Sequence, residues 1–126
     1  MHKNTDHRDP ERKANDYYRH CFGTENYYQY NTGHYLTDGV KEIAENENCF
    51  WFADIICSYQ YLNKFKNTQY QKWILERVKN CEFKVTASNL DDGEILITQE
   101  IPLSDFYFKE LVFLKKDNII LLPSED

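Results

Sequence analysis

The sequence predicts an α+β fold in which two or three N-terminal helices pack on a C-terminal sheet of four to five mostly antiparallel strands. Between residues 38 and 63, apolar residues recur every three or four positions, which is the period of an amphipathic helix. After residue 71 they alternate with polar residues, which is the period of a strand. The length of 126 residues fits one domain with its own core.

The first helix is expected over residues 38–47. Thr37 precedes it, where a hydroxyl can accept a hydrogen bond from the first unpaired N–H groups of a helix. Val40, Ile43 and Ala44 then share one face at helical spacing. This pattern predicts a short amphipathic helix.

The second helix is expected over residues 49–63, and it is the more apolar of the two. Large side chains recur there at spacings of three and four, and a helix that is apolar over most of its circumference lies centrally. The residues predicted to be buried are Trp51 or Phe52, together with Ile55, Ile56 and Tyr59.

The second half of the chain predicts strands joined by hairpins. The Asp-Gly pair in NLDDGE is a turn signal between two alternating runs, and KKDN separates two further apolar runs. The expected strands are residues 71–78, 82–88, 94–100, 110–114 and 118–122. A helix over residues 70–80 is the alternative for the first of these, since that run also contains good helix formers.

Residues 1–16 are predicted to form a polar, mobile N-terminal segment, and residues 17–126 a single α+β domain. The first segment carries mixed charges and a proline, and Met1 is its only large apolar residue. We see no internal repeat and no interdomain linker in the remainder.

The net charge and the apolar pattern limit the classes of partner. A formal charge of −6 disfavours non-specific binding to nucleic acid or anionic lipid. No apolar run approaches the ~18–20 residues that a membrane span requires, so no membrane contact is predicted. The N-terminus lacks the apolar segment of a secretory signal, which predicts a cytoplasmic protein whose four cysteines are reduced thiols.

Residues 17–35, YYRHCFGTENYYQYNTGHY, concentrate aromatic side chains. Tyrosine supplies a large amphipathic contact area, and each buried hydroxyl needs a hydrogen-bond partner, so part of this stretch is expected to face solvent. The predicted partner-binding face consists of Tyr17, Tyr18, Tyr27, Tyr28, Tyr30 and Tyr35. An aromatic belt that serves only packing is the alternative.

Residues 64–84 carry a local positive charge in an acidic chain. Cations that follow phosphates, beside aromatic rings that stack on bases, are the two requirements of single-strand binding. The possible RNA-binding residues are Lys64, Lys66, Lys72, Arg77, Lys79 and Lys84. A solvated face is the alternative.

A metal site is considered and not predicted. His20, Cys21, His34 and Cys49 are donors that zinc accepts, but adjacent side chains on an extended chain point apart, and the spacing from Cys21 to His34 fits no zinc-finger pattern. No metal and no cofactor are therefore expected.

Catalysis is not predicted either. A Cys–His pair needs a base that converges in space on the thiolate, and the sequence adjacency of His20 and Cys21 does not provide this. Asp91 and Asp92 lie in a Leu-Asp-Asp-Gly turn, where aspartate bonds its own backbone. No catalytic residue is assigned.

Five motifs carry a family resemblance. FGTENYY, YLTDGVK, DIICSYQ, LDDGEILITQEIPLSDF and IILLPSED, in this order, resemble a small bacterial and phage-associated family of unknown function over about residues 22–125. The resemblance implies a shared fold and carries no catalytic residue. Some small proteins from mobile elements resemble anti-CRISPR inhibitors, including inhibitors of the RNA-guided RNase of type VI-B systems.

The predicted function is accordingly that of a non-enzymatic interaction protein, an anti-CRISPR or other anti-defence inhibitor. Its expected partner is a larger protein, namely a CRISPR effector nuclease, with guide RNA as a possible further contact. The alternatives are a small-molecule-binding or regulatory domain and an unrecognised enzyme with Cys21 or the histidines at its site. The sequence does not define the oligomeric state.

Overall fold

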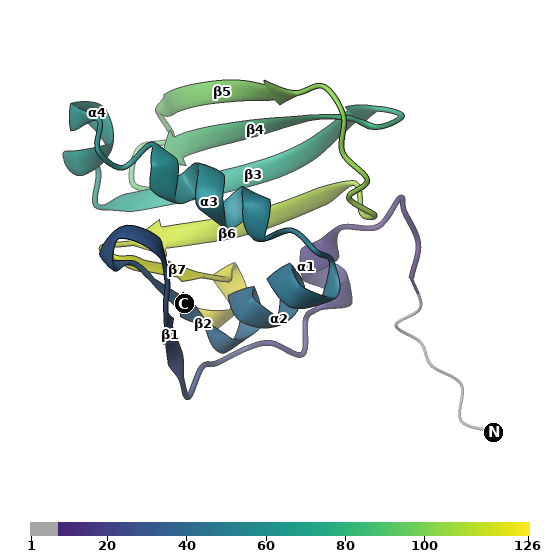
Figure 1. The fold of residues 1–126 in the computed structure, drawn as a ribbon, viewed down its shortest axis with the longest axis horizontal. Helices are drawn as coiled ribbons and strands as arrows, with labels where there is room; N and C mark the ends of the chain where they lie inside the picture. Colours follow the sequence, from purple (N-terminus) through teal and green to yellow (C-terminus); the bar gives the residue numbers. More distant parts are fainter. Residues whose placement is uncertain (1–7) are drawn as a thin grey trace.

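Seven strands form one sheet in the order β1-β2-β7-β6-β3-β4-β5 in the computed structural model, which describes residues 8–126 (Figure 1). The strands are β1 (Tyr27–Gln29), β2 (Tyr35–Thr37), β3 (Tyr70–Lys79), β4 (Glu82–Asn89), β5 (Ile95–Ile101), β6 (Glu110–Lys116) and β7 (Ile119–Leu121). The α-helices are α1 (Ala14–Tyr17), α2 (Asp38–Asn46), α3 (Phe50–Ser58) and α4 (Asn63–Lys66), and the 3₁₀ turns are η1 (Asn31–Gly33) and η2 (Pro123–Glu125).

The predicted sheet of four to five mostly antiparallel strands, preceded by helices, is wrong. The sheet is mixed, because β2 pairs with β7 in parallel through Tyr35 opposite Ile119 and Leu36 opposite Ile120. Two strands, β1 and β2, precede α2, α3 and α4. β1 lies inside the aromatic stretch, and β2 begins at its last residue, Tyr35. Each has three residues, too few to display an alternating pattern, and β2 depends on a partner more than 80 positions away in sequence.

The hairpins of the second half were predicted correctly. β3 pairs with β4, β4 with β5, and β6 with both β3 and β7, all antiparallel. The run from residue 70 to 79 is therefore a strand and not a helix. Its register brings Trp73 opposite Ala87 on one side and opposite Phe113 on the other.

Helix α2 begins as expected. The Thr37 side chain accepts a hydrogen bond from the Val40 N–H at 3.4 Å. The Glu125 carboxylate, from η2, adds a second cap, because it accepts from the Gly39 N–H at 2.9 Å and from the Thr37 hydroxyl at 2.6 Å. Two segments more than 80 residues apart thus satisfy the N-terminus of one helix.

The second helix is shorter than predicted. α3 ends at Ser58, and a separate turn, α4, follows an extended residue, Leu62, whose ψ is 142°. Phe52 and Ile56 are buried as predicted, but Trp51, Ile55 and Tyr59 are only half-buried.

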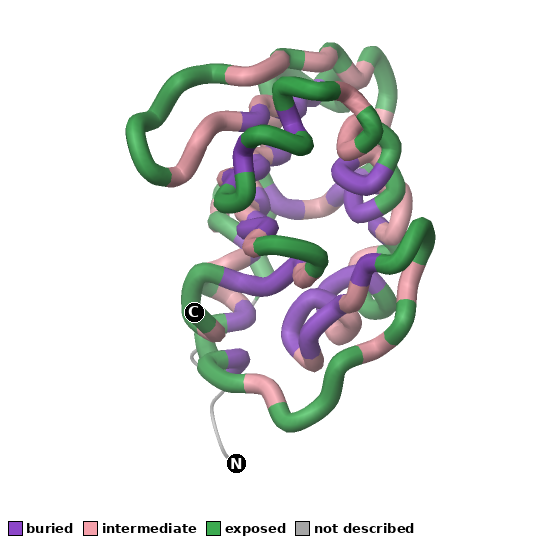
Figure 2. Tube along the Cα trace, turned by 90° about the vertical axis from the view of Figure 1, so that its left-hand side faces the viewer, coloured by how far each residue is buried: buried purple, intermediate pink, exposed green. Residues whose placement is uncertain are grey.

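The core lies between the sheet and the helices. Helices α2 and α3 lie on the same face of the sheet, on the right-hand side of Figure 2, and each contributes four buried residues to the core. Phe52 of α3 stacks on Phe113 of β6 at a ring-centroid distance of 5.0 Å, and Trp73 of β3 stacks on Phe65 of α4 at 5.6 Å. Alternate residues of the central strands therefore face the helices, and the residues between them face the other side.

Residues 8–13 lie against the domain, whereas the remainder of the predicted mobile segment, residues 1–7, lies outside the described residues. Arg8 donates two hydrogen bonds to the Glu47 carboxylate, at 2.8 and 2.9 Å. The Asn15 side chain of α1 both donates to the Val112 carbonyl and accepts from its N–H, which continues the hydrogen bonding at the free edge of β6. The mobility of residues 1–16 stays a prediction.

Candidate functional site

The six tyrosines of the aromatic stretch do not share one exposed face. Tyr18 is buried, Tyr27 is 56% exposed, and the other four are half-buried. Tyr27 and Tyr28 point to opposite faces of β1, as alternation requires. A binding role for these residues stays a prediction, but most of their area is used within the domain.

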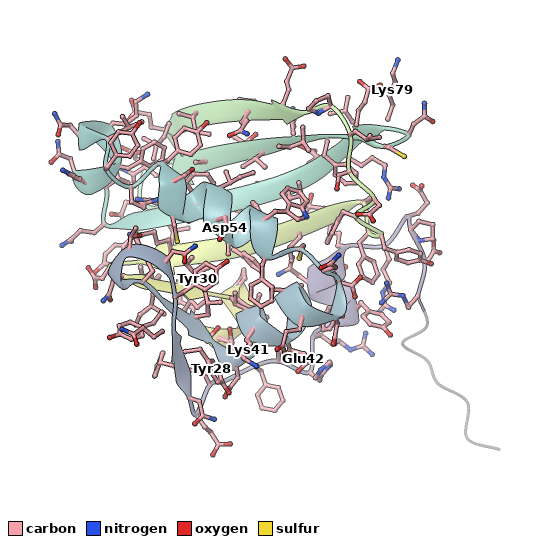
Figure 3. The ribbon with its side chains drawn as sticks, viewed as in Figure 1. Tyr28, Tyr30, Lys41, Glu42, Asp54 and Lys79 are labelled. Carbon is pink, nitrogen blue, oxygen red and sulfur yellow. The ribbon has the colours of Figure 1, made fainter. Side chains whose placement is uncertain are left out.

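The tyrosine hydroxyls are paired with carboxylates inside the domain. Tyr28 donates to Asp38 at 2.8 Å, and Tyr30 donates to Asp54 at 2.5 Å. Figure 3 shows Tyr30 pointing from the loop after β1 towards Asp54 on α3. Two backbone N–H groups and Tyr28 together hold the pKa of the Asp38 carboxyl at about 2. These contacts fasten β1 and its loop to α2 and α3.

The six basic residues proposed for RNA are dispersed. Lys64 and Lys66 lie on α4, Lys72 and Lys84 project from the sheet face opposite the helices, and Lys79 lies at the β3–β4 hairpin tip, as labelled in Figure 3. Arg77, the sixth residue, is directed towards the protein interior. The Arg77 guanidinium donates to the backbone carbonyls of Phe106, Tyr107 and Phe108, at 3.2, 2.8 and 3.4 Å. It orders the segment before β6, and the other five cations form no single patch.

A different surface combines free backbone with uncovered apolar side chains, at the last strand of the sheet. β5 ends the strand order, and in the described part of the chain no strand pairs with its outer edge (Figure 1, top). An edge strand presents a row of N–H and C=O groups that can pair with another chain. A backbone carbonyl of β5, that of Leu96, accepts from the Lys64 ammonium at 2.9 Å.

One flank of α3 lies beside this edge and is incompletely covered. Its half-buried apolar side chains face the β5 residues that point towards the helices, and the two elements are joined where the Tyr59 hydroxyl donates to Gln99 at 2.8 Å. We use the name β5–α3 groove for this incompletely covered apolar surface, whose end at Trp51 and Ile101 is hollowed into a pocket. It is formed by Trp51, Ile55, Tyr59 and Leu62 on the helical side and by Ile97, Gln99 and Ile101 on the strand.

The groove ends in a pocket of about 510 Å³. Trp51, Ile101 and Leu103 form its apolar wall, and Cys81, Ser104 and Asp105 form its rim. Leu103 is 78% exposed, which is unusual for a leucine, and it borders the pocket. The pocket is wide enough to receive a large side chain from a bound segment.

The surroundings of this edge are acidic. Exposed carboxylates lie at the turn before β5, on β5 itself and in the segment that follows it, while Lys64 contacts its backbone. The carboxylates belong to Asp91, Asp92, Glu94, Glu100 and Asp105. The edge therefore favours a partner that is apolar at its centre and cationic elsewhere.

A second pocket, of about 550 Å³, opens between η1 and the end of β6. His34, Cys57 and Lys115 are buried in its wall. The Lys115 ammonium donates to the Asp117 carbonyl, and burial lowers its pKa. Burial, together with the charge of Asp54, raises the pKa of the Cys57 thiol to about 11. Sequence analysis did not indicate Lys115, because it was assigned to the KKDN turn between two strands, whereas it belongs to β6.

His20 and Cys21 are brought together with a residue that sequence reasoning missed. The His20 ring lies 2.8 Å from one Glu42 carboxylate oxygen, and the Cys21 sulfur lies 3.8 Å from the other. Glu42 is on α2 and is labelled in Figure 3. The other two donors considered from the sequence, His34 and Cys49, are not part of this group.

The fold and these surfaces define an α+β protein built on a mixed sheet whose edge at β5 is partly apolar. The chain belongs to a family of unknown function, DUF6876, which matches residues 12–126. The expected resemblance to a family of unknown function is thus confirmed, and both the phage association and the link to anti-CRISPR inhibitors remain proposals. No curated protein and no solved structure matches the chain. Across residues 8–126, no helix has the length and apolar character needed to cross a bilayer.

Proposed function

We propose that this protein is a non-enzymatic interaction protein that binds an extended segment of a larger partner by adding it as a strand to the outer edge of β5. The observation that carries the proposal is the β5–α3 groove, where a free strand edge lies beside an uncovered apolar helix flank. Recognition of this kind takes its affinity from backbone hydrogen bonds and its specificity from alternate side chains.

The geometry specifies the partner segment. β5 has seven residues, so at 3.4 Å per residue it offers roughly 24 Å of edge. Alternate side chains of an added strand point towards α3, where they cover Ile55 and Tyr59, and one reaches the pocket beside Trp51. Because the edge is surrounded by carboxylates, the segment carries lysine or arginine at positions that face away from α3.

Selection of peptides from a random display library against the full chain tests this proposal. The enriched peptides should alternate apolar residues and carry net positive charge. Their binding should slow hydrogen exchange in residues 95–101, since new backbone pairing protects amides. Trp51→Ala should weaken binding at least tenfold, as loss of an anchoring aromatic does. Phe22→Ala is the matched control, because Phe22 is 78% exposed and lies outside the groove, and it should change the affinity less than twofold.

Three results would count against strand addition at β5. The first is the absence of any enriched peptide. The second is protection at amides outside the β5–α3 groove. The third is an equal loss of affinity in the Trp51 and Phe22 variants, which would indicate non-specific apolar contact.

We propose an RNA-guided nuclease of the type VI-B class as the first partner to examine, in the cytoplasm. The family resemblance to proteins from mobile elements supports this choice, and the lack of an assigned catalytic residue agrees with a steric inhibitor. The assay is cleavage of target RNA by the purified nuclease, with size-exclusion chromatography to detect a complex. If neither cleavage nor elution changes at a tenfold excess of the protein, this partner is rejected and strand addition remains to be judged by the peptide experiment.

Contact with guide RNA is a separable part of the proposal. Lys64 and Lys66 lie on α4 at one end of β5, where both are exposed. If they contact phosphates, their joint replacement by alanine should weaken nuclease binding and also reduce its salt dependence. If the salt dependence of nuclease binding is unchanged, contact with guide RNA is rejected and an inhibitor that binds only the protein part of the complex is retained.

The pocket lined by His34, Cys57 and Lys115 favours a second candidate function, binding of a small anionic molecule. A buried ammonium whose protein partner is a backbone carbonyl attracts a carboxylate or phosphate. A thermal-shift screen of metabolite carboxylates and phosphates, with Lys115→Met as the matched variant, tests it. A ligand that raises the melting temperature of the wild-type and Lys115→Met proteins equally would show that it does not bind in this pocket.

A further inference from the structure

Three metal-binding side chains of different chemistry converge on the far side of the domain from β5. The His20 ring nitrogen, the Cys21 sulfur and a Glu42 carboxylate oxygen all lie within 4.8 Å of one another. They come from two elements, because His20 and Cys21 end the turn after α1 and Glu42 belongs to α2. This group lies outside the β5–α3 groove and is unrelated to the proposed strand addition.

The local fold explains why adjacent residues reach one point. The backbone at residues 18–20 forms a turn, and the Cys21 N–H closes it by donating to the Tyr18 carbonyl at 2.9 Å. The expectation that neighbouring side chains diverge applies to an extended chain, and the turn removes it. The Ser124 hydroxyl donates to the Cys21 carbonyl, which holds this backbone against the C-terminal segment.

The distances from Glu42 to the other two ligand atoms are close to those found around a bound zinc ion. With zinc–nitrogen and zinc–sulfur bonds of ~2.0 and ~2.3 Å, tetrahedral ligand atoms lie roughly 3–4 Å apart. The observed His20–Glu42 and Cys21–Glu42 separations are 2.8 and 3.8 Å. The side chains of His20 and Glu42 are 60% and 41% exposed, so small rotations suffice to place both around a central ion. Cys21 is buried and supplies the fixed ligand.

The electrostatics also favour a cation. The carboxylates of Glu42, Glu125 and Asp38 act electrostatically on the Cys21 side chain, so the surroundings of the three ligands are negative. A divalent cation bound there would offset this negative charge.

We propose that His20, Cys21 and Glu42 bind one divalent transition metal of the zinc class, with a fourth position occupied by water. Thiolate and imidazole ligands select zinc, cobalt or nickel over magnesium and calcium, which prefer oxygen. Three protein ligands and one open position distinguish this arrangement from a closed structural site with four. The bound ion joins the turn after α1 to α2, through ligands that are 21 and 22 residues apart in sequence.

Cobalt substitution tests the proposal directly. Titration of Co²⁺ into the full chain, kept reduced, should produce the near-ultraviolet charge-transfer band of thiolate ligation and visible bands of tetrahedral cobalt at a stoichiometry of one. Zinc should displace the cobalt, because it binds such sites more tightly. Cys21→Ser should abolish the charge-transfer band, and Glu42→Gln and His20→Ala should each weaken binding at least tenfold.

Cys81→Ser is the matched control, since Cys81 is an exposed thiol on another surface. This variant should keep the full cobalt spectrum. Circular dichroism of each variant identifies any that fail to fold. If Cys21→Ser or His20→Ala does not fold, the cobalt affinity of Glu42→Gln is used to judge the proposal instead. The proposal is overturned if wild-type protein shows no charge-transfer band, if the band survives in Cys21→Ser, or if it is lost in Cys81→Ser.

Discussion

Two neighbouring isoleucines of α3 should differ sharply in their contribution to stability. Ile56 is fully buried in the core, whereas Ile55 is half-buried on the flank that lines the β5–α3 groove. The same replacement, isoleucine by alanine, can be made at both positions. Because they share one helix and one residue type, changes in helix propensity cancel between the two variants.

The expected magnitudes follow from burial. Ile56→Ala removes three carbons from water-free surroundings, which costs about 2.4 kcal/mol at ~0.8 kcal/mol per methylene. The cavity left behind adds a further cost, so the total loss of unfolding free energy should be about 3–4 kcal/mol. Ile55→Ala removes the same carbons from a partly solvated flank and leaves no closed cavity, so about 1 kcal/mol is expected.

Urea unfolding followed by circular dichroism measures both values. The slope of free energy against urea should be unchanged, so the midpoint shift reports stability. Equal losses at the two positions would show that the flank of α3 is covered as completely as its core face. The β5–α3 groove would then be no binding surface, and the argument for strand addition would lose its apolar component.

Three further perturbations test other contacts. Gln71→Leu should cost about 2–4 kcal/mol in urea unfolding, because Gln71 is fully buried and bonds two backbone carbonyls and an indole N–H that would lose their partner. Arg8→Ala should destabilise by about 1–2 kcal/mol at pH 7, where it leaves the buried Glu47 carboxylate with fewer donors. Burial opposes ionisation of Glu47, but the hydrogen bonds from Arg8 and a tyrosine outweigh the effect of burial and lower the pKa of the carboxyl. The ionised carboxylate therefore stabilises the fold above pH ~4.5, and this contribution is lost as the pH falls through the folded-state pKa. Urea unfolding measured at a series of pH values should show the loss. Gly39→Ala should lower the melting temperature, since its Cβ would lie 2.7 Å from a Leu122 methyl group; an unchanged melting temperature would mean that η2 is free to shift.

The parts of the fold that sequence analysis predicts are those whose signals are local. The β4–β5 hairpin was predicted because the Asp-Gly turn and the alternating runs beside it lie within about twenty residues. Likewise, Thr37 signals the start of α2 by itself. Such features need no knowledge of distant partners.

The parts that it missed depend on distant segments. β2 joins the sheet through β7, and nothing in three residues of sequence reveals a parallel partner more than 80 positions away. Glu42 could not be recognised as a neighbour of His20, since only the packing of α2 on the turn after α1 brings them together. The partial exposure of Ile55 could not be predicted either, because an apolar residue on a mostly apolar helix is expected to be buried in the core.

The order in which the chain leaves the ribosome makes the pairing of β2 with β7 a late event. β2 and the N-terminus of α2 emerge early, yet they are completed by Ile119, Ile120 and Glu125. Closing so long a loop has an entropic cost that only the finished contacts offset. During synthesis β1 and β2 can pair with each other, but the inner edge of β2 stays unpaired until β7 has emerged. Chaperones that bind exposed strand edges therefore have their longest opportunity at residues 35–37.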